Sequence, residues 1–551
     1  MEKIKSAVYY SDFGAVGDGV TNDFEALYNA HIYANENKLP VFGENGKTYY
    51  IETTEKDGVA RSIPIQTDTD WCGAHFIIDD TNIKHIPSKT PRNSAINIFT
   101  VCSHIPTLRI EGEALSKLGK IGPNTTKIDL GLGYPAMLII YNENRRVYIR
   151  NGFGCTNSGN PQQELVVVDK DGNVDKTTSL LLDYDEISYI DVIRDDIEPL
   201  TIQNAEFTCL ASRVNILTKL EDGTVKKCSA YFRRGMGISR SHTHVKNIKH
   251  FVKGEFTVEE QAQGFSGPPY RGFFAASMAN DVLIENCVIT ARRNYAPGTY
   301  AIGAGLTNQF VCKNCVQSNF YMPGTKRLSM EISPLTGKLE YWGVGGSNYS
   351  KNMVFDSCLL NRFDAHAGLY NGKIINSRVS MVNLIGGGDM LIENTVFELS
   401  NATIINLRAD YGSTWNGTVT IRNCKVEPNN EVTKKTELRL VGQYWLNHYF
   451  GYTCYSPNLI VDNLEIVGEE LPIHVTNWIN RGNPGELNVY TEKLLCEPIT
   501  SEGVPNENQV IPPKFIKIIN NHAGHSYDIV DVPMFRDTEI IGAIKVNPEE
   551  A

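Results

Sequence analysis

The chain has 551 residues, a formal net charge of -11, 41% hydrophobic residues and 21% charged residues. This length exceeds the usual ceiling for one compact core, so the chain is either several domains or one elongated array of repeats. The negative balance, without a sustained run of lysine or arginine, excludes the broad positive surface of nucleic-acid-binding proteins, and we expect no nucleic-acid partner.

The opening residues and the cysteines indicate in which cellular compartment the protein is expected. The chain begins with charged and turn-forming residues, and no segment has about 18 consecutive apolar residues, so we expect no leader, no membrane partner and a cytoplasmic location, although a trimmed chain would leave secretion open. The scattered cysteines, such as Cys287 and Cys358, suit buried thiols. Cys312 and Cys315 have metal-ligand spacing but lack a second pair, and we expect no metal there.

The N-terminal segment predicts a cap. Residues 10–23 form a turn-rich stretch, and a helical pattern with an apolar stripe of Phe24, Leu27, Tyr28 and Ile32 then runs to about Asn37. We assign residues 1–60 to this capping helix and the first strands.

Two hairpin patterns follow. Residues 166–174 and 220–225 each place glycine in a turn between strand-like runs. We therefore expect residues 61–235 to hold early coils elaborated by β-hairpins.

A repeated phrase dominates the next segment. It consists of alternating apolar residues, then Asn or Ser, then a second short strand, and residues 283–289 are the clearest copy. Its Asn or Ser positions recur every 17 to 43 residues, and the shortest intervals hold three short strands. These positions are Asn204, Asn247, Asn286, Asn314, Ser357, Ser377, Asn394, Asn423 and Asn463.

Stacked coils explain the asparagines. Coils with three strands each would stack at about 4.8 Å, and Asn tolerates the left-handed turn conformation while its amide bonds to the coil above. A β-sandwich or propeller would instead show regular antiparallel hairpins. The sequence therefore predicts an all-β, right-handed parallel β-helix, regular over residues 236–470, with a C-terminal β-rich cap or oligomerisation region over 471–551.

The N-terminal motif and the repeats resemble those of the pectate-lyase-like superfamily of right-handed parallel β-helix proteins. That superfamily includes polygalacturonase-like glycoside hydrolases, polysaccharide lyases and phage tailspikes. The resemblance implies the fold, a carbohydrate substrate and a cleft along one outer sheet. The Asn-Thr-Asp, paired-Asp and Gly-His-Gly series of polygalacturonases is missing here, so an enzyme of this sequence would use other residues.

The expected outer sheet contains residues 300–306, 341–346, 369–371, 383–387 and 404–408. Strand alternation places Arg362, Asp364 and His366 on one face, where a histidine beside a carboxylate can carry a proton at neutral pH and serve in acid–base catalysis. The alternative is a polar ladder that bonds adjacent coils.

A second cluster lies farther along the chain. Arg408 and Asp410 alternate outward, while Tyr411 and Trp415 could stack on a sugar ring. Asp389 follows a run of three glycines, and we expect it to lie one coil from Asp410, so that the two carboxylates divide acid and base roles. The alternatives are that Asp389 ends a turn and that Asp410 pairs with Arg408.

Other side chains are candidates for holding substrate. Arg240 lies beside two histidines on one face and could bind an acidic sugar, and Arg271 and Trp342 could contact a glycan. Two histidines at i and i+2 can ligate a metal, but no third ligand is identifiable, so we expect none.

These features favour a carbohydrate-active enzyme, first a glycoside hydrolase that uses Asp364, Asp389 and Asp410, with His366 and Arg408 tuning charge and no cofactor. The alternatives are a polysaccharide lyase or uronate epimerase, and a non-enzymatic spike or glycan-binding protein. The expected partner is an oligo- or polysaccharide, and a homo-oligomer, either a trimer or a dimer, is compatible with the sequence.

Overall fold

A computed structural model describes most of the chain. The described residues are 6–52, 54–56, 59–79, 97–150, 157–210, 216–219, 225–228, 234–253, 273–289, 300–317, 331–332, 339–340, 344–399, 402–428, 437–446, 449–468, 471–481, 487–489, 510–531 and 537–548.

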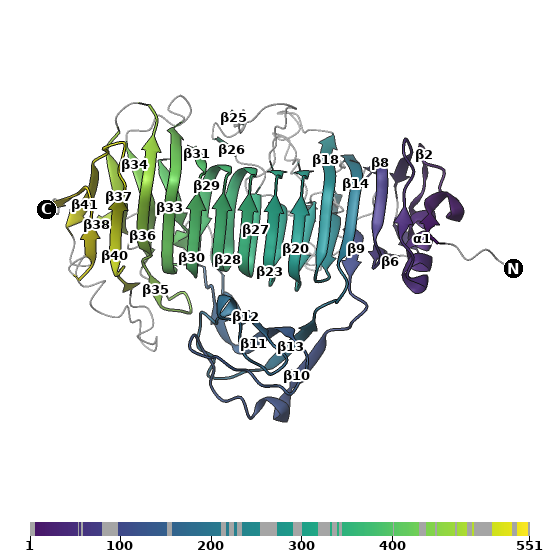
Figure 1. The fold of residues 1–551 in the computed structure, drawn as a ribbon, viewed down its shortest axis with the longest axis horizontal. Coiled ribbons are helices and arrows are strands. Elements are labelled where there is room, and N and C mark those ends of the chain that lie inside the picture. The colour runs from purple at the N-terminus through teal and green to yellow at the C-terminus, as the bar shows by residue number, and fades with distance from the viewer. Residues whose placement is uncertain are drawn as a thin grey trace.

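The chain winds into an elongated, almost entirely parallel β-helix with a smaller β-domain on one flank (Figure 1). Its first strands are β1 (Val8–Tyr9), β2 (Asp18–Asn22), β3 (Val41–Phe42), β4 (Thr48–Ile51), β7 (Ile63–Ile65), β8 (Thr69–Asp79), β9 (Asn97–Cys102) and β14 (Leu200–Leu210). The middle strands are β17 (Arg234–Ser239), β18 (Thr243–Lys253), β19 (Phe274–Ser277), β20 (Asn280–Glu285), β21 (Val288–Ile289), β22 (Tyr300–Gly305), β23 (Asn308–Lys313), β24 (Val316–Gln317), β27 (Val344–Asp356) and β28 (Leu359–Ile375).

The last coils continue to the C-terminal strands. They contain β29 (Arg378–Leu384), β30 (Gly386–Glu393), β31 (Val396–Leu399), β32 (Thr403–Leu407), β33 (Trp415–Pro428), β34 (Leu438–Leu446), β36 (Asn458–Ile466), β37 (Ile473–Arg481), β38 (Leu487–Val489), β40 (Phe515–Ile519), β41 (Tyr527–Asp531), β42 (Glu539–Ile541) and β43 (Ile544–Pro548). Parallel pairing links β34 to β37, β41 and β43 in turn. The repeat therefore extends past residue 470, where the sequence pattern had become too weak to follow.

In the described part of the chain, four two-stranded sheets lie outside this array. Antiparallel pairs join β5 (Glu55–Lys56) to β6 (Val59–Ala60), β15 (Ile216–Lys219) to β16 (Val225–Cys228), and β25 (Glu331–Ile332) to β26 (Leu339–Glu340). A parallel pair joins β35 (Cys454–Tyr455) to β39 (Val510–Ile511).

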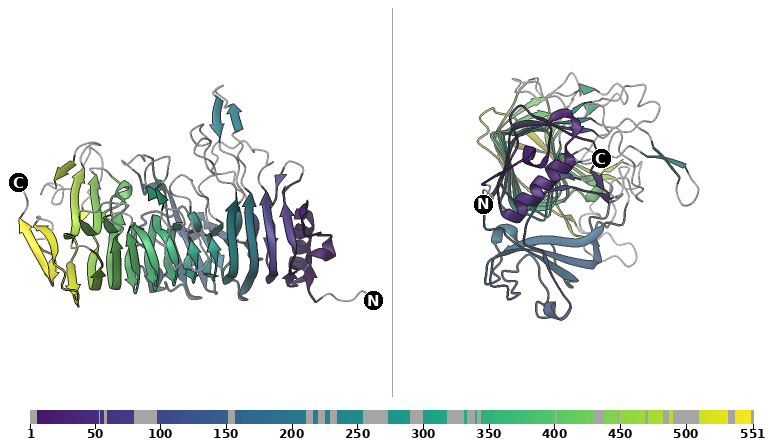
Figure 2. Two further views of the ribbon diagram at one scale, coloured as in Figure 1. Left: turned by 90° about the horizontal axis from the view of Figure 1, so that it is seen from above. Right: turned by 90° about the vertical axis from the view of Figure 1, so that its right-hand side faces the viewer.

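The predicted capping helix is confirmed as α1 (Phe24–Asn37), which covers the N-terminal end of the coil (Figure 2). Phe24 and Leu27 are buried, and the helix shields edges of the first coil that would otherwise be open to pairing with another chain. Among the described residues, no helix has the length and apolar character needed to cross a membrane.

The asparagine turns are confirmed. Asn286 and Asn314 have φ angles of 54° and 53°, and the Asn314 side-chain amide donates to Asn286 Oδ1 at 3.2 Å. In one copy of the repeat the left-handed residue is Asn376, immediately before Ser377. The turn of this copy therefore lies one residue earlier than predicted. Each asparagine amide thus makes a hydrogen bond to the turn of the neighbouring coil, as stacking requires.

The repeated apolar residues form a ladder inside the coil. One inward column places each residue in register with its equivalent on the next coil, and burial of each such side chain contributes about 1.5–3 kcal/mol. Its members are Ile202, Val245, Ile284, Cys312, Phe355, Ile374, Ile392, Ile421, Val461 and Ile518.

The outer sheet has a different membership from the one predicted. Asp364 pairs with Asn383, which pairs with Asn406, so β28 contributes its first half to this sheet. Leu369 instead pairs with Gly386 on another face of the coil. The prediction that residues 369–371 belong with 383 was wrong because β28 bends within one long strand, at Gly368, whose φ is 90°.

Residues 103–199 leave the coil and form a separate domain. Its antiparallel sheet has the order β10 (Leu108–Glu111), β13 (Tyr189–Arg194), β11 (Ala136–Val147) and β12 (Asn160–Val168). One face carries its own apolar core, and the other face packs toward Met278 and Leu306 of the coil. The segment is thus a domain of its own in the described part of the chain, below the coils in Figure 1.

Candidate functional site

The two clusters predicted on the outer sheet meet in one ionic network. Arg408 bridges two carboxylates, with Nη1 2.9 Å from Asp364 Oδ1 and Nη2 2.9 Å from Asp410 Oδ2. Arg362 Nη2 donates to Asp364 Oδ2 at 2.6 Å. Arg150, which follows β11 of the inserted domain, donates from Nε to Asp410 Oδ2 at 2.7 Å.

This network leaves its carboxylates poorly suited to contact substrate. Asp364 has no exposed side-chain surface, and Asp410 is 10% exposed. Burial raises the pKa of Asp410, but Arg408 and Arg150 outweigh that effect and hold the pKa below its usual value. An ionised carboxylate that accepts from two arginines is a poor proton donor, so the arrangement fits the interior ion-pair alternative better than a catalytic pair.

His366 lies beside this network and is neutral at neutral pH. Burial lowers its pKa to about 4, and the Arg408 charge acts in the same direction. Its Nδ1 lies 3.3 Å from Asn348 Oδ1, and its ring contacts that of Tyr411. The expectation that a neighbouring carboxylate would keep this histidine protonated was wrong, because burial and the arginines dominate.

We expect His366 to make the protein sensitive to acid. Since its folded pKa of about 4 is below the usual 6.5, the unfolded chain binds the extra proton between these values, and stability falls as the pH drops through that window. Urea unfolding of H366Q from pH 7 to pH 4 should show a shallower decline than the wild type. The exposed His522 supplies the control H522Q, and an equal effect of both variants would contradict this assignment.

Tyr411 and Trp415 are not available for stacking on a sugar. Trp415 has no exposed surface, and its Nε1 donates to the Gly388 carbonyl at 3.1 Å. Tyr411 is buried against the rings of Tyr148 and His366. The stacking predictions were wrong because both rings are buried, Tyr411 against Tyr148 of the inserted domain and Trp415 with its Nε1 bonded to the coil backbone.

Asp389 does not pair with Asp410. It is exposed at the surface of β30 and lies in register with Thr418, whereas Asp410 lies before β33 in the short η5 helix (Ala409–Tyr411). The three glycines before Asp389 allow close packing, since a Cβ on Gly387 would lie 2.7 Å from Leu181 Cδ2. The predicted carboxylate pair was therefore wrong, and the glycine run allows close packing of the neighbouring coils, with Gly387 also leaving room for Leu181 of the inserted domain.

The remaining sequence candidates have structural roles or lie outside the described residues. The Arg240 guanidinium is buried and donates to the backbone carbonyls of Glu198 and Ser241, so the predicted contact with an acidic sugar is wrong. Arg271 and Trp342 lie outside the described residues. Within the described ranges, no three His, Cys, Asp or Glu side chains converge as metal ligands would.

A buried lysine fixes the inserted domain against the coil. Lys351 Nζ from β27 lies 3.5 Å from Glu164 Oε2 of β12 and donates to the carbonyls of Thr178 and Ser179 at 3.0 and 2.6 Å. Burial lowers the pKa of Lys351 to about 8 and raises that of Glu164. These bonds hold the domain in one orientation.

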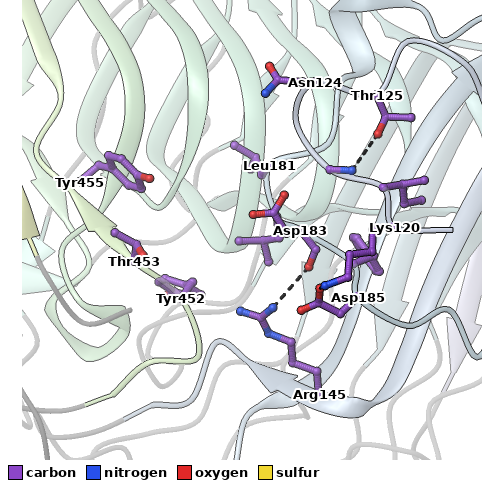
Figure 3. Close-up of a pocket in the computed structure, with 14 residues that line it drawn as sticks. Lys120, Asn124, Thr125, Arg145, Leu181, Asp183, Asp185, Tyr452, Thr453 and Tyr455 are labelled. Carbon is purple, nitrogen blue, oxygen red and sulfur yellow. Dashed lines mark hydrogen bonds and ion pairs between the residues drawn. The ribbon is translucent and has the colours of Figure 1, made fainter. Parts of the chain in front are cut away.

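A cleft of about 510 Å³ lies at this junction and was not predicted (Figure 3). Tyr452, Thr453 and Tyr455 line it from the coil, and Asp183 and Asp185 line it from the inserted domain. We call it the junction cleft. Its further lining residues are Lys120, Ile121, Gly122, Asn124, Thr125, Arg145, Leu181, Leu182 and Tyr184.

The two aspartates flank one buried tyrosine. Tyr184, which lies between them, is buried and bonds with the Ile121 backbone, while Asp183 and Asp185 are both exposed. Tyr184 forms an isolated β-bridge with Ile121, and the two aspartates that flank it both line the cleft. The Asp183 carbonyl accepts from Gln162 Nε2 at 2.9 Å, which anchors the segment. Asp185 lies 2.6 Å from Lys120 Nζ, which lowers the pKa of that carboxyl.

Comparison with known proteins addresses the fold. The tailspike gp49 of Pseudomonas phage LKA1 superimposes with a TM-score of 0.52 at 11% identity, over 97% of this chain and 84% of that chain. The gp54 tailspike of Acinetobacter baumannii bacteriophage AP22, solved with a capsular saccharide, has a TM-score of 0.48 at 9% identity, over 97% and 79%.

This chain has a right-handed parallel β-helix fold, which the tailspike gp49 shares. The resemblance seen in the sequence is thus confirmed for the fold. At such identities the likeness does not define the reaction, which depends on the side chains of the site.

Sequence comparison adds one short match. No family model matches the chain. A capsule KL64-specific depolymerase of Klebsiella phage P510 is 32% identical over 98 residues, which cover 15% of this chain and 10% of that protein. The chain thus matches a tenth of the length of this relative.

One signal in the sequence could have indicated the cleft of this β-helix protein. Residues 182–185 alternate apolar and acidic side chains, which is typical of an extended segment with two carboxylates on one face. The facing tyrosines follow some 270 residues later, and only the docking of the inserted domain brings the two segments together.

Proposed function

We propose that this protein binds a polysaccharide in the junction cleft and cleaves it by hydrolysis. The observation that carries the proposal is the arrangement of Asp183 and Asp185, which face the tyrosines of the coil across the cleft. Hydrolysis of a glycosidic bond needs two carboxyl groups beside the bond, one as acid and one as base or nucleophile.

The ion pair with Lys120 distinguishes the two aspartates. It favours the charged form of Asp185, which suits a base or nucleophile, and Asp183 is the second carboxyl group in the cleft. The Tyr455 ring is half-buried at the opposite wall and offers an apolar face to a sugar. This assignment requires no cofactor.

The short relative supports the class of substrate. Its printed name describes a depolymerase specific for a capsule, and we propose that this chain likewise acts on a bacterial surface polysaccharide. The β-helix offers a stiff scaffold for an extended polymer.

The same cleft also supports a lyase as a second candidate. Lys120 and Arg145 line it, and cations can stabilise the negative charge that forms when a base removes the proton beside a uronate carboxylate. The two reactions leave different products, because a lyase creates a double bond and a hydrolase adds water.

Digestion of a panel of capsular polysaccharides should separate these reactions. We expect the wild type to release fragments that have gained the mass of water, and D183N and D185N to reduce the rate by at least about 100-fold. Gly122→Ala is a further test, since its Cβ would lie 2.1 Å from Asp183 Oδ1 and displace that carboxylate. This variant should lose activity without a change in its unfolding midpoint.

The matched control is D171N. Asp171 is an exposed aspartate of the same domain that pairs with Lys170 at 2.9 Å, as Asp185 pairs with Lys120, but it lies outside the cleft. Full activity of D171N is expected. Products with ultraviolet absorbance would establish the lyase instead, and binding without any product would overturn the enzymatic proposal in favour of a glycan-binding protein.

A further inference from the structure

A small inner chamber opens beside the junction cleft. The two share the residues Leu181, Leu182, Tyr452, Thr453 and Tyr455. The chamber extends toward the coil, where its other lining residues are Tyr148, Gly386, Thr414 and Asn416. Its volume is about 30 Å³, and a cavity needs about 10–15 Å³ to admit one water molecule. A group of two or three heavy atoms fits there, and a sugar ring does not.

The walls of the chamber are held in place from behind. The Glu164 carboxylate accepts from the backbone amides of Leu181 and Leu182 at 2.7 and 3.0 Å, and Lys351 in turn holds Glu164. The absence of a side chain on Gly387 lets Leu181 lie against the coil. The chamber is therefore preformed, which lowers the entropic cost of filling it.

The lining has an apolar interior and a polar mouth. Leucine and tyrosine side chains surround the interior, whereas Asn416 is exposed and carries amide donors. No Lys or Arg is among the residues that line this chamber. This chemistry suits a methyl group that carries a neighbouring carbonyl, and it disfavours a charged group such as phosphate or carboxylate.

We infer that the chamber receives the acetyl substituent of a sugar bound in the junction cleft. This inference rests on the proposed function, because it takes the sugar itself to occupy the cleft. The acetyl methyl lies against Leu181 and Tyr148, and its carbonyl accepts from the Asn416 amide. The chamber thus selects acetylated over unacetylated residues of the polysaccharide.

Saturation-transfer NMR on the full chain tests this inference without requiring cleavage. The probes are the methyl glycosides of N-acetylglucosamine, glucose and fucose, which carry an acetyl group, no such group and a ring methyl group. We expect the acetyl methyl to receive at least threefold more saturation than the ring protons, and the other two glycosides to bind more weakly.

Variants of Leu181 and Asn416 identify the chamber. L181Q should abolish the preference for the acetyl methyl, whereas the volume-conserving control L181M should retain it. N416A should weaken the binding of the N-acetylglucosamine glycoside relative to that of the fucose glycoside. Because Asn416 is exposed, the unfolding midpoint of this variant should not change. Equal saturation of all protons, equal binding of fucose or an unchanged signal in L181Q would overturn the inference. D183N should keep the acetyl signal, so a loss of catalysis is distinguishable from a loss of this subsite.

Discussion

Replacing Lys351 with methionine is expected to lower the free energy of unfolding by about 3–5 kcal/mol. Methionine leaves the buried Glu164 carboxylate without its cation and the carbonyls of Thr178 and Ser179 without a donor. Urea unfolding measures the loss, and hydrogen exchange of residues 176–185 should become faster because the inserted domain is no longer held against the coil.

The control for this variant is K313M. Lys313 lies 3.8 Å from Glu285 but is 48% exposed, so water screens that pair and its loss should cost about 0–1 kcal/mol. Pairing K351M with E164Q should recover part of the stability, since no buried charge is then left unpaired. Equal effects of K351M and K313M would contradict the role assigned to Lys351.

The variant R408M is expected to cost on the order of 3 kcal/mol. Arg408 is 10% exposed and joins Asp364 to Asp410, and its removal leaves each of these buried carboxylates with one arginine fewer. The free energy of unfolding from urea titrations at pH 7 measures the effect. The network also ties Arg150 to the coil, so the junction cleft should lose rigidity in this variant.

R422M is the matched control for that measurement. Arg422 also bridges two carboxylates, with Nη1 3.4 Å from Glu393 and Nε 3.1 Å from Asp462, but it is 43% exposed. Solvent screening should reduce its contribution to about 0–1 kcal/mol. A loss in R422M as large as that in R408M would show that burial does not set the strength of these bridges.

The candidate residues on the outer sheet show what a local sequence pattern can predict and what it cannot. Alternation correctly placed Arg362 beside Asp364, but it treated Arg408 and Asp410 as a separate cluster, which the structure joins to the first through Arg408 and Asp364. It did not show that Arg150, which is 260 residues from Asp410 in the sequence, completes the network. The pattern therefore identified the cluster of charges but not its burial, and burial decides whether a carboxylate can meet a substrate.

The aromatic candidates were wrong for a related reason. A stacking role for Tyr411 and Trp415 requires both rings to be exposed to a sugar. Trp415 has no exposed surface, and Tyr411 is buried against Tyr148 of the inserted domain, where the Tyr452 hydroxyl donates to the Tyr411 carbonyl at 2.7 Å. Residues that face a docked domain cannot be distinguished by local pattern from residues that face solvent.

The sequence by itself determined the β-helix. Its apolar periodicity defines the inward column, and asparagines such as Asn286 and Asn314 adopt the left-handed turns and bond from coil to coil. These interactions join equivalent positions of successive coils, so they appear in the sequence as a repeat. The tertiary structure alone decided where a cleft opens, because Asp183 and Tyr455 meet only through the docking of a non-repeating domain. Such docking depends on single contacts, including that of Lys351 with Glu164, which leave no period in the sequence.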